Sequence, residues 1–145
     1  MKLREDINRT LADLASRIGL ESLTLDAADS VMLGFDGDLE ILVELDGNRG
    51  RLVLSSQLGV PPHDEGTRLH PLLLMNNALW NDLDLYFALD GSTGQVLVFR
   101  PVVAAGLDAA GLEGHLEEIL QFAERWRDVV RAPRDALAAS SAQPG

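Results

Sequence analysis

Apolar residues recur at helical spacing near both ends of the chain. The first stripe falls within residues 3–18 and consists of Leu3, Ile7, Leu11, Leu14 and Ile18. This spacing predicts an amphipathic helix, and Gly19 stands where glycine often ends one. The second stripe predicts a long last helix over residues 108–131 and consists of Leu112, Leu116, Ile119, Ala123, Trp126 and Val130.

Between these helices the apolar residues alternate with polar ones, which is typical of strands. Residues 23–56 are predicted as antiparallel strands, beginning with the alternating segment Ser22–Asp26 and turning at Asp36–Asp38 and Asp46–Gly50. A second predicted hairpin follows over residues 84–100, where Pro101 is expected to end the last strand. The element order is α-β-β-β-α-β-β-α, and the class is α+β with helices packed on an antiparallel sheet.

The segment between the two groups of strands, roughly residues 67–81, predicts a helix that is apolar on nearly all sides. Pro71 fits only the first turn, so the regular helix is expected from near His70. One sheet can bury only one side of such a helix. We therefore expect it to pair with a second copy of the chain; complete burial within one chain is the alternative. The predicted dimer interface consists of Leu72, Leu73, Met75, Leu79 and Trp80.

Composition narrows the class of protein. The chain has 145 residues, no cysteine and a net charge of −11, so neither disulfides nor thiolate metal sites are available. We expect one domain over residues 1–131 and a flexible C-terminal tail over 132–145. The N-terminus lacks the apolar core of a signal peptide, and no apolar run reaches membrane-spanning length, which favours a cytoplasmic protein. The acidic charge argues against binding nucleic acid or an anionic membrane.

Residues that would carry catalysis do not fall into recognisable patterns. The three histidines, His63, His70 and His115, lack metal-ligand spacing, and the glycines form no phosphate-binding motif. We therefore expect no enzymatic activity, no metal and no cofactor.

The remaining apolar surface suggests protein binding. Part of the first helix and the first predicted strand is expected to form a groove that holds a peptide by apolar pockets and strand addition. The alternative is that the first helix packs wholly on the core. The predicted client-binding residues are Leu3, Ile7, Leu11, Val31, Leu33 and Phe35.

Three segments carry a resemblance to a known family: Leu11–Leu20 followed by Leu23–Asp26, the leucine-rich Leu72–Asn77, and the hairpin Leu85–Phe99. Together with the element order, over about residues 3–131, they resemble the class I type III secretion chaperones, the CesT or Tir-chaperone family. The resemblance implies a homodimer that binds the N-terminal chaperone-binding segment of an effector and keeps it non-globular and secretion-competent, without ATP.

The segment Arg17–Asp26 is also similar to the start of ExsC-type proteins. That resemblance implies a regulatory chaperone that sequesters a small anti-activator and couples secretion to transcription. The expected partner is therefore an effector protein or a small regulatory protein. An adaptor outside secretion and a small enzyme stay open as alternatives.

Overall fold

The computed structural model describes residues 2–35, 38–62 and 72–132. Its elements are α1 (Lys2–Ile18), β1 (Ser30–Phe35), β2 (Leu39–Asp46), β3 (Arg51–Gly59), α3 (Asn76–Leu83), β4 (Tyr86–Leu89), β5 (Val96–Val103) and α4 (Ala109–Arg131). The strands form one five-stranded sheet in the order β1-β2-β3-β5-β4, with every neighbouring pair antiparallel. The predicted α+β class and antiparallel sheet are confirmed.

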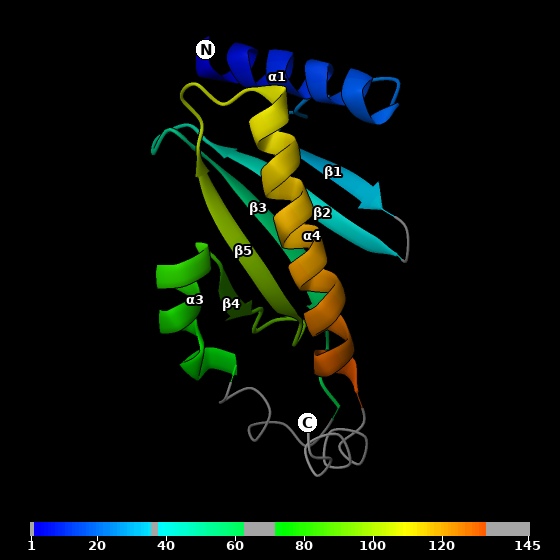
Figure 1. The fold of residues 1–145 in the computed structure, drawn as a ribbon, viewed down its shortest axis with the longest axis vertical. Coiled ribbons are helices and arrows are strands. Elements are labelled where there is room, and N and C mark those ends of the chain that lie inside the picture. The colour runs from blue at the N-terminus through cyan, green and yellow to red at the C-terminus, as the bar shows by residue number, and fades with distance from the viewer. Residues whose placement is uncertain (1, 36–37, 63–71, 133–145) are drawn as a thin grey trace.

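One face of the sheet is covered by α4, which contacts β2, β3 and β5, while α1 lies across one end of the sheet and contacts α4 (Figure 1). The alternation in β2 explains the layering, because Leu39, Ile41 and Val43 are buried whereas Glu40 and Glu44 are exposed. The apolar stripe of α4 completes this core through Leu112, Leu116, Ile119, Ala123 and Val130.

Two of the contacts that hold the first helix in place join it to residues far along the chain, in and just before α4. Arg17 forms an ion pair with Glu113 of α4, with 3.0 Å between Nε and Oε2. The hydroxyl of Thr10 donates a hydrogen bond to the carbonyl oxygen of Leu107 at 3.1 Å. Gly19 follows the helix with a φ of +79°, the left-handed conformation that glycine adopts at little cost.

The prediction of a strand at Ser22–Asp26 was wrong. No strand among the described residues pairs with this segment. Its backbone is held by side chains of α1 instead. The backbone N–H of Leu25 donates to Asn8 Oδ1 at 2.8 Å, and Arg4 donates to the carbonyl oxygens of Leu25 and Asp26 at 3.1 and 3.0 Å. Leu25 is buried beneath α1. The alternation therefore reflects a packed connection and not a sheet ladder.

Asp26 also closes the turn that leads into β1. Its carboxylate accepts hydrogen bonds from the backbone N–H groups of Ser30 and Ala28 at 3.1 and 2.8 Å. These bonds favour the ionised form and lower the pKa of Asp26 below its ordinary value.

The fifth strand runs further than the sequence predicted, because Pro101 lies inside β5 and pairs with Val53 of β3. On the other side of β5, pairing with β4 stops at Phe99. At Pro101, the side of β5 that faces away from β3 has no partner strand in the described part of the chain. A missing N–H on that side costs no hydrogen bond between strands.

The middle helix is shorter and more broken than predicted. Residues 72–74 are helical, Met75 is a turn, and α3 begins at Asn76. Asp84 ends α3 with a left-handed φ of +52°. The predicted start near His70, the loop around His63 and the tail from residue 133 lie outside the described residues. Within the described part of the chain, no helix has the length and apolar character needed to cross a lipid bilayer.

Candidate partner-binding surface

The sheet face opposite α4, here called the open face, carries partly exposed apolar side chains. The strand registers place Met32, Leu42, Val53, Leu97, Phe99 and Val103 on this face. Met32 and Val103 are 51% and 73% exposed. Polar residues such as Glu44 and Ser55 lie between these apolar side chains on the same face. A mixed apolar and polar surface of this kind is a candidate interaction site.

A hollow of about 230 Å³ lies on the open face across β1, β2, β3 and β5. Met32, Leu42 and Leu97 give it apolar walls, Asp38 and Glu40 add carboxylates, and Arg131 adds a guanidinium. An apolar side chain with charged neighbours fits this combination, because the walls cover the apolar group while the carboxylates attract a base and Arg131 attracts an acid.

An aromatic cluster extends the open face toward α3. The rings of Tyr86 and Phe99 stack with centroids 5.2 Å apart, and Trp80 of α3 meets Tyr86 edge-on at 5.9 Å. Trp80 is 47% exposed. Large, rigid aromatic side chains of this kind are common anchors of protein interfaces.

The predicted dimer-interface residues divide into two groups. Leu72 and Leu79 are buried in the core of their own chain, so they have little surface to offer a second copy. Leu73 and Trp80 are exposed, and Met75 is half-buried. The helix is interrupted at Met75, and the segments on either side of the break each place one leucine, Leu72 or Leu79, in the core. Of the predicted dimer-interface residues, Leu73, Met75 and Trp80 have side-chain surface that a second copy could contact.

The predicted client-binding residues divide in the same way. Ile7, Leu11 and Leu33 are 1%, 0% and 2% exposed and belong to the core, so burial removes them from the candidate client surface. Leu3, Val31 and Phe35 are half-buried and remain candidates. For α1 the structure favours the alternative that its apolar stripe packs on the core.

The residues predicted to bind a client did not include Met32 or the other apolar residues of the open face. The signal was present, because Met32 occupies the outward phase of a strand whose inward phase is Val31, Leu33 and Phe35. An apolar residue in the outward phase of alternation marks surface that is kept apolar on both sides of the sheet.

The two edges of the sheet differ in what they offer a partner. At the β4 edge, the side-chain amide of Asn76 forms hydrogen bonds with the outward-facing backbone N–H and carbonyl of Phe87. Phe87 N–H donates to Asn76 Oδ1 at 2.6 Å, and Asn76 Nδ2 donates to the carbonyl of Phe87 at 3.0 Å. At the other edge, no described strand pairs with the outer side of β1. Strand addition by a partner therefore fits β1 and is obstructed at β4.

Comparisons with known proteins establish the family of this chain. Residues 9–127 match the model of the Tir chaperone protein (CesT) family. The transcriptional anti-antiactivator ExsC of Pseudomonas aeruginosa is 34% identical over 142 residues, which cover 96% of this chain and 97% of ExsC.

Two solved structures show the same fold. A chain in the crystal structure of the ExsC–ExsE complex is 33% identical with a TM-score of 0.80, and the match covers 91% of this chain and 98% of that chain. A chain of the HopA1–SchA chaperone–effector complex is 17% identical with a TM-score of 0.77, covering 88% and 98%. The chain described here belongs to the Tir chaperone protein (CesT) family.

Proposed function

We propose that this chain is a type III secretion chaperone of the ExsC type, which sequesters a small regulatory protein and thereby couples secretion to transcription. The observation that carries this choice is the 34% identity to an anti-antiactivator over 96% of the chain. The open face and the free β1 edge supply the surface that such a binding protein needs. The proposed activity is stoichiometric capture in the cytoplasm, without catalysis or a cofactor.

The proposed mechanism is the ordering of a flexible partner segment. An extended segment adds to the β1 edge and places alternate side chains against Val31 and Phe35 on one side and Met32 on the other. Apolar burial on the open face offsets the entropy that the segment loses on binding. Asp38 and Glu40 attract a basic residue of the partner segment, and Arg131, which lines the same hollow, attracts an acidic one.

The proposed active form is a homodimer. The exposed apolar side chains at the α3 end of the open face, Leu73 and Trp80, are the surface that a second copy would cover. Leu74 and Leu83, which are 70% and 47% exposed, lie on the same segment. Leaving this many apolar groups in water would promote unspecific association, and a symmetric contact buries them in a defined way.

Escort of an effector is the second candidate function, and membership of the CesT family supports it. In that case the partner is the N-terminal segment of a larger exported protein. The same surface would bind it, so the two functions differ in the identity of the partner and not in the site.

Affinity purification of the tagged protein from its own host, followed by mass spectrometry, separates these functions. Capture of a small regulatory protein supports the ExsC-type function. Capture of a large exported protein through its N-terminal region supports effector escort. Recovery of the chaperone alone, under both secreting and non-secreting conditions, would contradict both.

A matched pair of variants tests the open face in the same experiment. Met32→Glu charges the open face, whereas Leu20→Glu makes the same change at a residue that is 44% exposed just after α1. We expect Met32→Glu to lose the partner and Leu20→Glu to keep it. Light scattering reports separately whether either variant has become a monomer. Full partner recovery with Met32→Glu would show that the open face is not the binding surface.

A further inference from the structure

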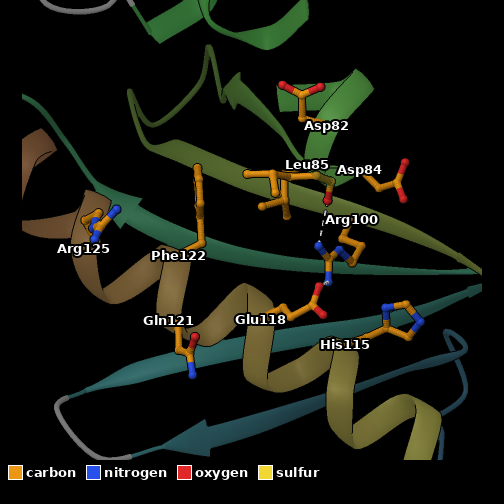
Figure 2. Close-up of a pocket in the computed structure, with 10 residues that line it drawn as sticks. Asp82, Asp84, Leu85, Arg100, His115, Glu118, Gln121, Phe122 and Arg125 are labelled. Atoms are coloured by element: carbon orange, nitrogen blue, oxygen red, sulfur yellow. Dashed lines mark hydrogen bonds and ion pairs between the residues drawn. The ribbon is translucent and has the colours of Figure 1, made fainter. Parts of the chain in front are cut away.

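A polar cleft of about 610 Å³ lies on the helix-covered side of the sheet, away from the open face. It is bounded by α4 and by the connection from α3 to β4 (Figure 2). Polar side chains follow one side of α4 along the cleft, and they are His115, Glu118, Gln121 and Arg125. Arg100 enters the cleft from β5, between these two walls.

Arg100 occupies a position where an apolar residue would be expected. The inward positions of β5 are Val96, Val98, Arg100 and Val102. Arg100 is 4% exposed and is the only charged residue among the buried residues that the structure describes. Taking a guanidinium out of water costs several kcal/mol, and an apolar side chain of similar volume is often at least as stable. Stability alone therefore does not explain an arginine here.

The guanidinium is fixed by one partner and covered by another that can move. Nη2 donates to the carbonyl oxygen of Leu83 at 2.7 Å, which ties Arg100 to the end of α3. Nη1 donates to Glu118 Oε2 at 2.6 Å, and the Glu118 side chain is 67% exposed. Glu118 can thus turn out into water whereas Arg100 cannot, and its departure leaves a buried guanidinium unpaired unless another anion takes its place.

The cleft also holds buried polar atoms that have no hydrogen-bond partner among the described residues. Arg100 Nε is buried and has no hydrogen-bond partner among the described residues, and His115 Nδ1 in the same cleft is in the same situation. Buried polar atoms without partners are rare in native proteins and call for an explanation. A rigid, buried guanidinium with a replaceable carboxylate on it is the arrangement of a preformed carboxylate receptor.

We propose that this cleft is a carboxylate-binding site in which an incoming carboxylate replaces Glu118 on Arg100. Gln121 and Arg125, which line the same side of α4, supply further donors to the incoming group. Leu85 and Phe122 cover the apolar carbons next to that group. The carboxylate comes from an acidic side chain of a bound polypeptide or from a small carboxylic acid, and the chemistry on Arg100 is the same.

The surrounding charge sets limits on this site. Asp82 and Asp84 are exposed and line the cleft. In a chain of net charge −11, they slow the approach of an anion. The field is screened by salt, whereas the contact with buried Arg100 is screened much less. Binding should therefore survive at physiological ionic strength.

The test is a nuclear magnetic resonance titration of the full chain that follows the Arg100 Nε–H signal and the ring C–H signals of His115. Three probes are compared: a capped glycine–serine hexapeptide with one central glutamate, the same peptide with glutamine, and succinate. We expect saturable shifts with the glutamate peptide or with succinate, and none with the glutamine peptide. Saturation by the peptide alone identifies a polypeptide side chain as the source, and saturation by succinate alone identifies a small acid.

Two substitutions and a control make the test specific. Glu118→Gln removes the negative charge of the resident competitor and should tighten binding by at least about twofold, because one partner of this ion pair is exposed and the other is buried. Glu117→Gln removes the adjacent exposed carboxylate of α4 and should leave the affinity unchanged. Arg100→Met should abolish the His115 shifts. The proposal is overturned if Glu118→Gln shows no saturable shift with either carboxylate probe. This variant changes only an exposed side chain, so it should fold normally even if Arg100→Met does not.

Discussion

Removing the side-chain amide of Asn76 should loosen the β4 edge of the sheet. In Asn76→Ala, Phe87 loses a donor at 3.0 Å and an acceptor at 2.6 Å in one step. A typical hydrogen bond contributes about 0.5–1.5 kcal/mol, which gives about 1–3 kcal/mol for the pair. The site is only part-buried, so water can reach the freed groups, and alanine suits a helix better than asparagine. The expected loss is therefore about 1–2 kcal/mol.

Chemical unfolding in urea and thermal unfolding, each followed by circular dichroism, measure this loss. At about 2–4 °C per kcal/mol for a chain of this size, Tm should fall by about 2–8 °C. Hydrogen exchange adds a local readout, because the Phe87 amide should exchange faster than its neighbours in β5. All variants are compared at one protein concentration, since association would shift apparent stability.

Asn77→Ala is the matched control, because Asn77 is the exposed neighbour in the same helix. It should change the free energy of unfolding by less than about 0.5 kcal/mol. Equal stability of the two variants would refute the argument that Asn76 satisfies the β4 edge. Self-association of Asn76→Ala that grows with concentration would indicate that the freed edge now recruits another strand.

Three further results are expected. Leu33→Glu should lower the free energy of unfolding by about 3–5 kcal/mol or prevent folding, because it puts a charge into the core. Met32→Glu on the open face should change it by less than about 0.5 kcal/mol. Urea unfolding of the two variants checks this contrast. Gly59→Ala should destabilise the chain by about 1–3 kcal/mol, since Gly59 has a φ of +112° and an added Cβ would meet the Arg131 side chain; equal urea midpoints would contradict it. Burial, with the nearby charge of Arg100, lowers the pKa of His115 below its ordinary value while Glu118 opposes the shift, so Glu118→Gln should lower that pKa further in a nuclear magnetic resonance pH titration. Because the folded-state pKa lies below the unfolded one, the contribution of His115 to stability is present above the ordinary histidine pKa and is lost as the pH falls toward the folded value.

The sequence predicted the elements whose periodicity is long and regular. The stripe of α4 and the alternation of β2 each repeat often enough to fix the element type and the buried side. The segment Ser22–Asp26 misled because a packed connection can alternate as a strand does. What distinguishes the two is a set of contacts from Arg4 and Asn8 of α1, and these come from tertiary structure.

The functional surface was harder to predict because exposure depends on packing between elements. Ile7 and Leu11 look the same in sequence whether α1 lies on the core or lines a groove. Arg100 looked like an ordinary charged residue at a strand end, since Pro101 was expected to stop the strand. Only the continuation of β5 past Pro101 shows that Arg100 lies inside a buried row.

The strand order of the sheet also constrains how the chain is made. β3 lies at the centre, and it pairs on one side with β2 and on the other with β5, which is synthesised much later. At about 5–20 residues per second, a nascent chain keeps the apolar face of β1–β3 uncovered for several seconds before α4 leaves the ribosome. Pairing over such sequence separations also slows folding itself. The last helix is therefore the element whose arrival commits the chain to its native fold, and a chain cut short before α4 should be a substrate for other chaperones.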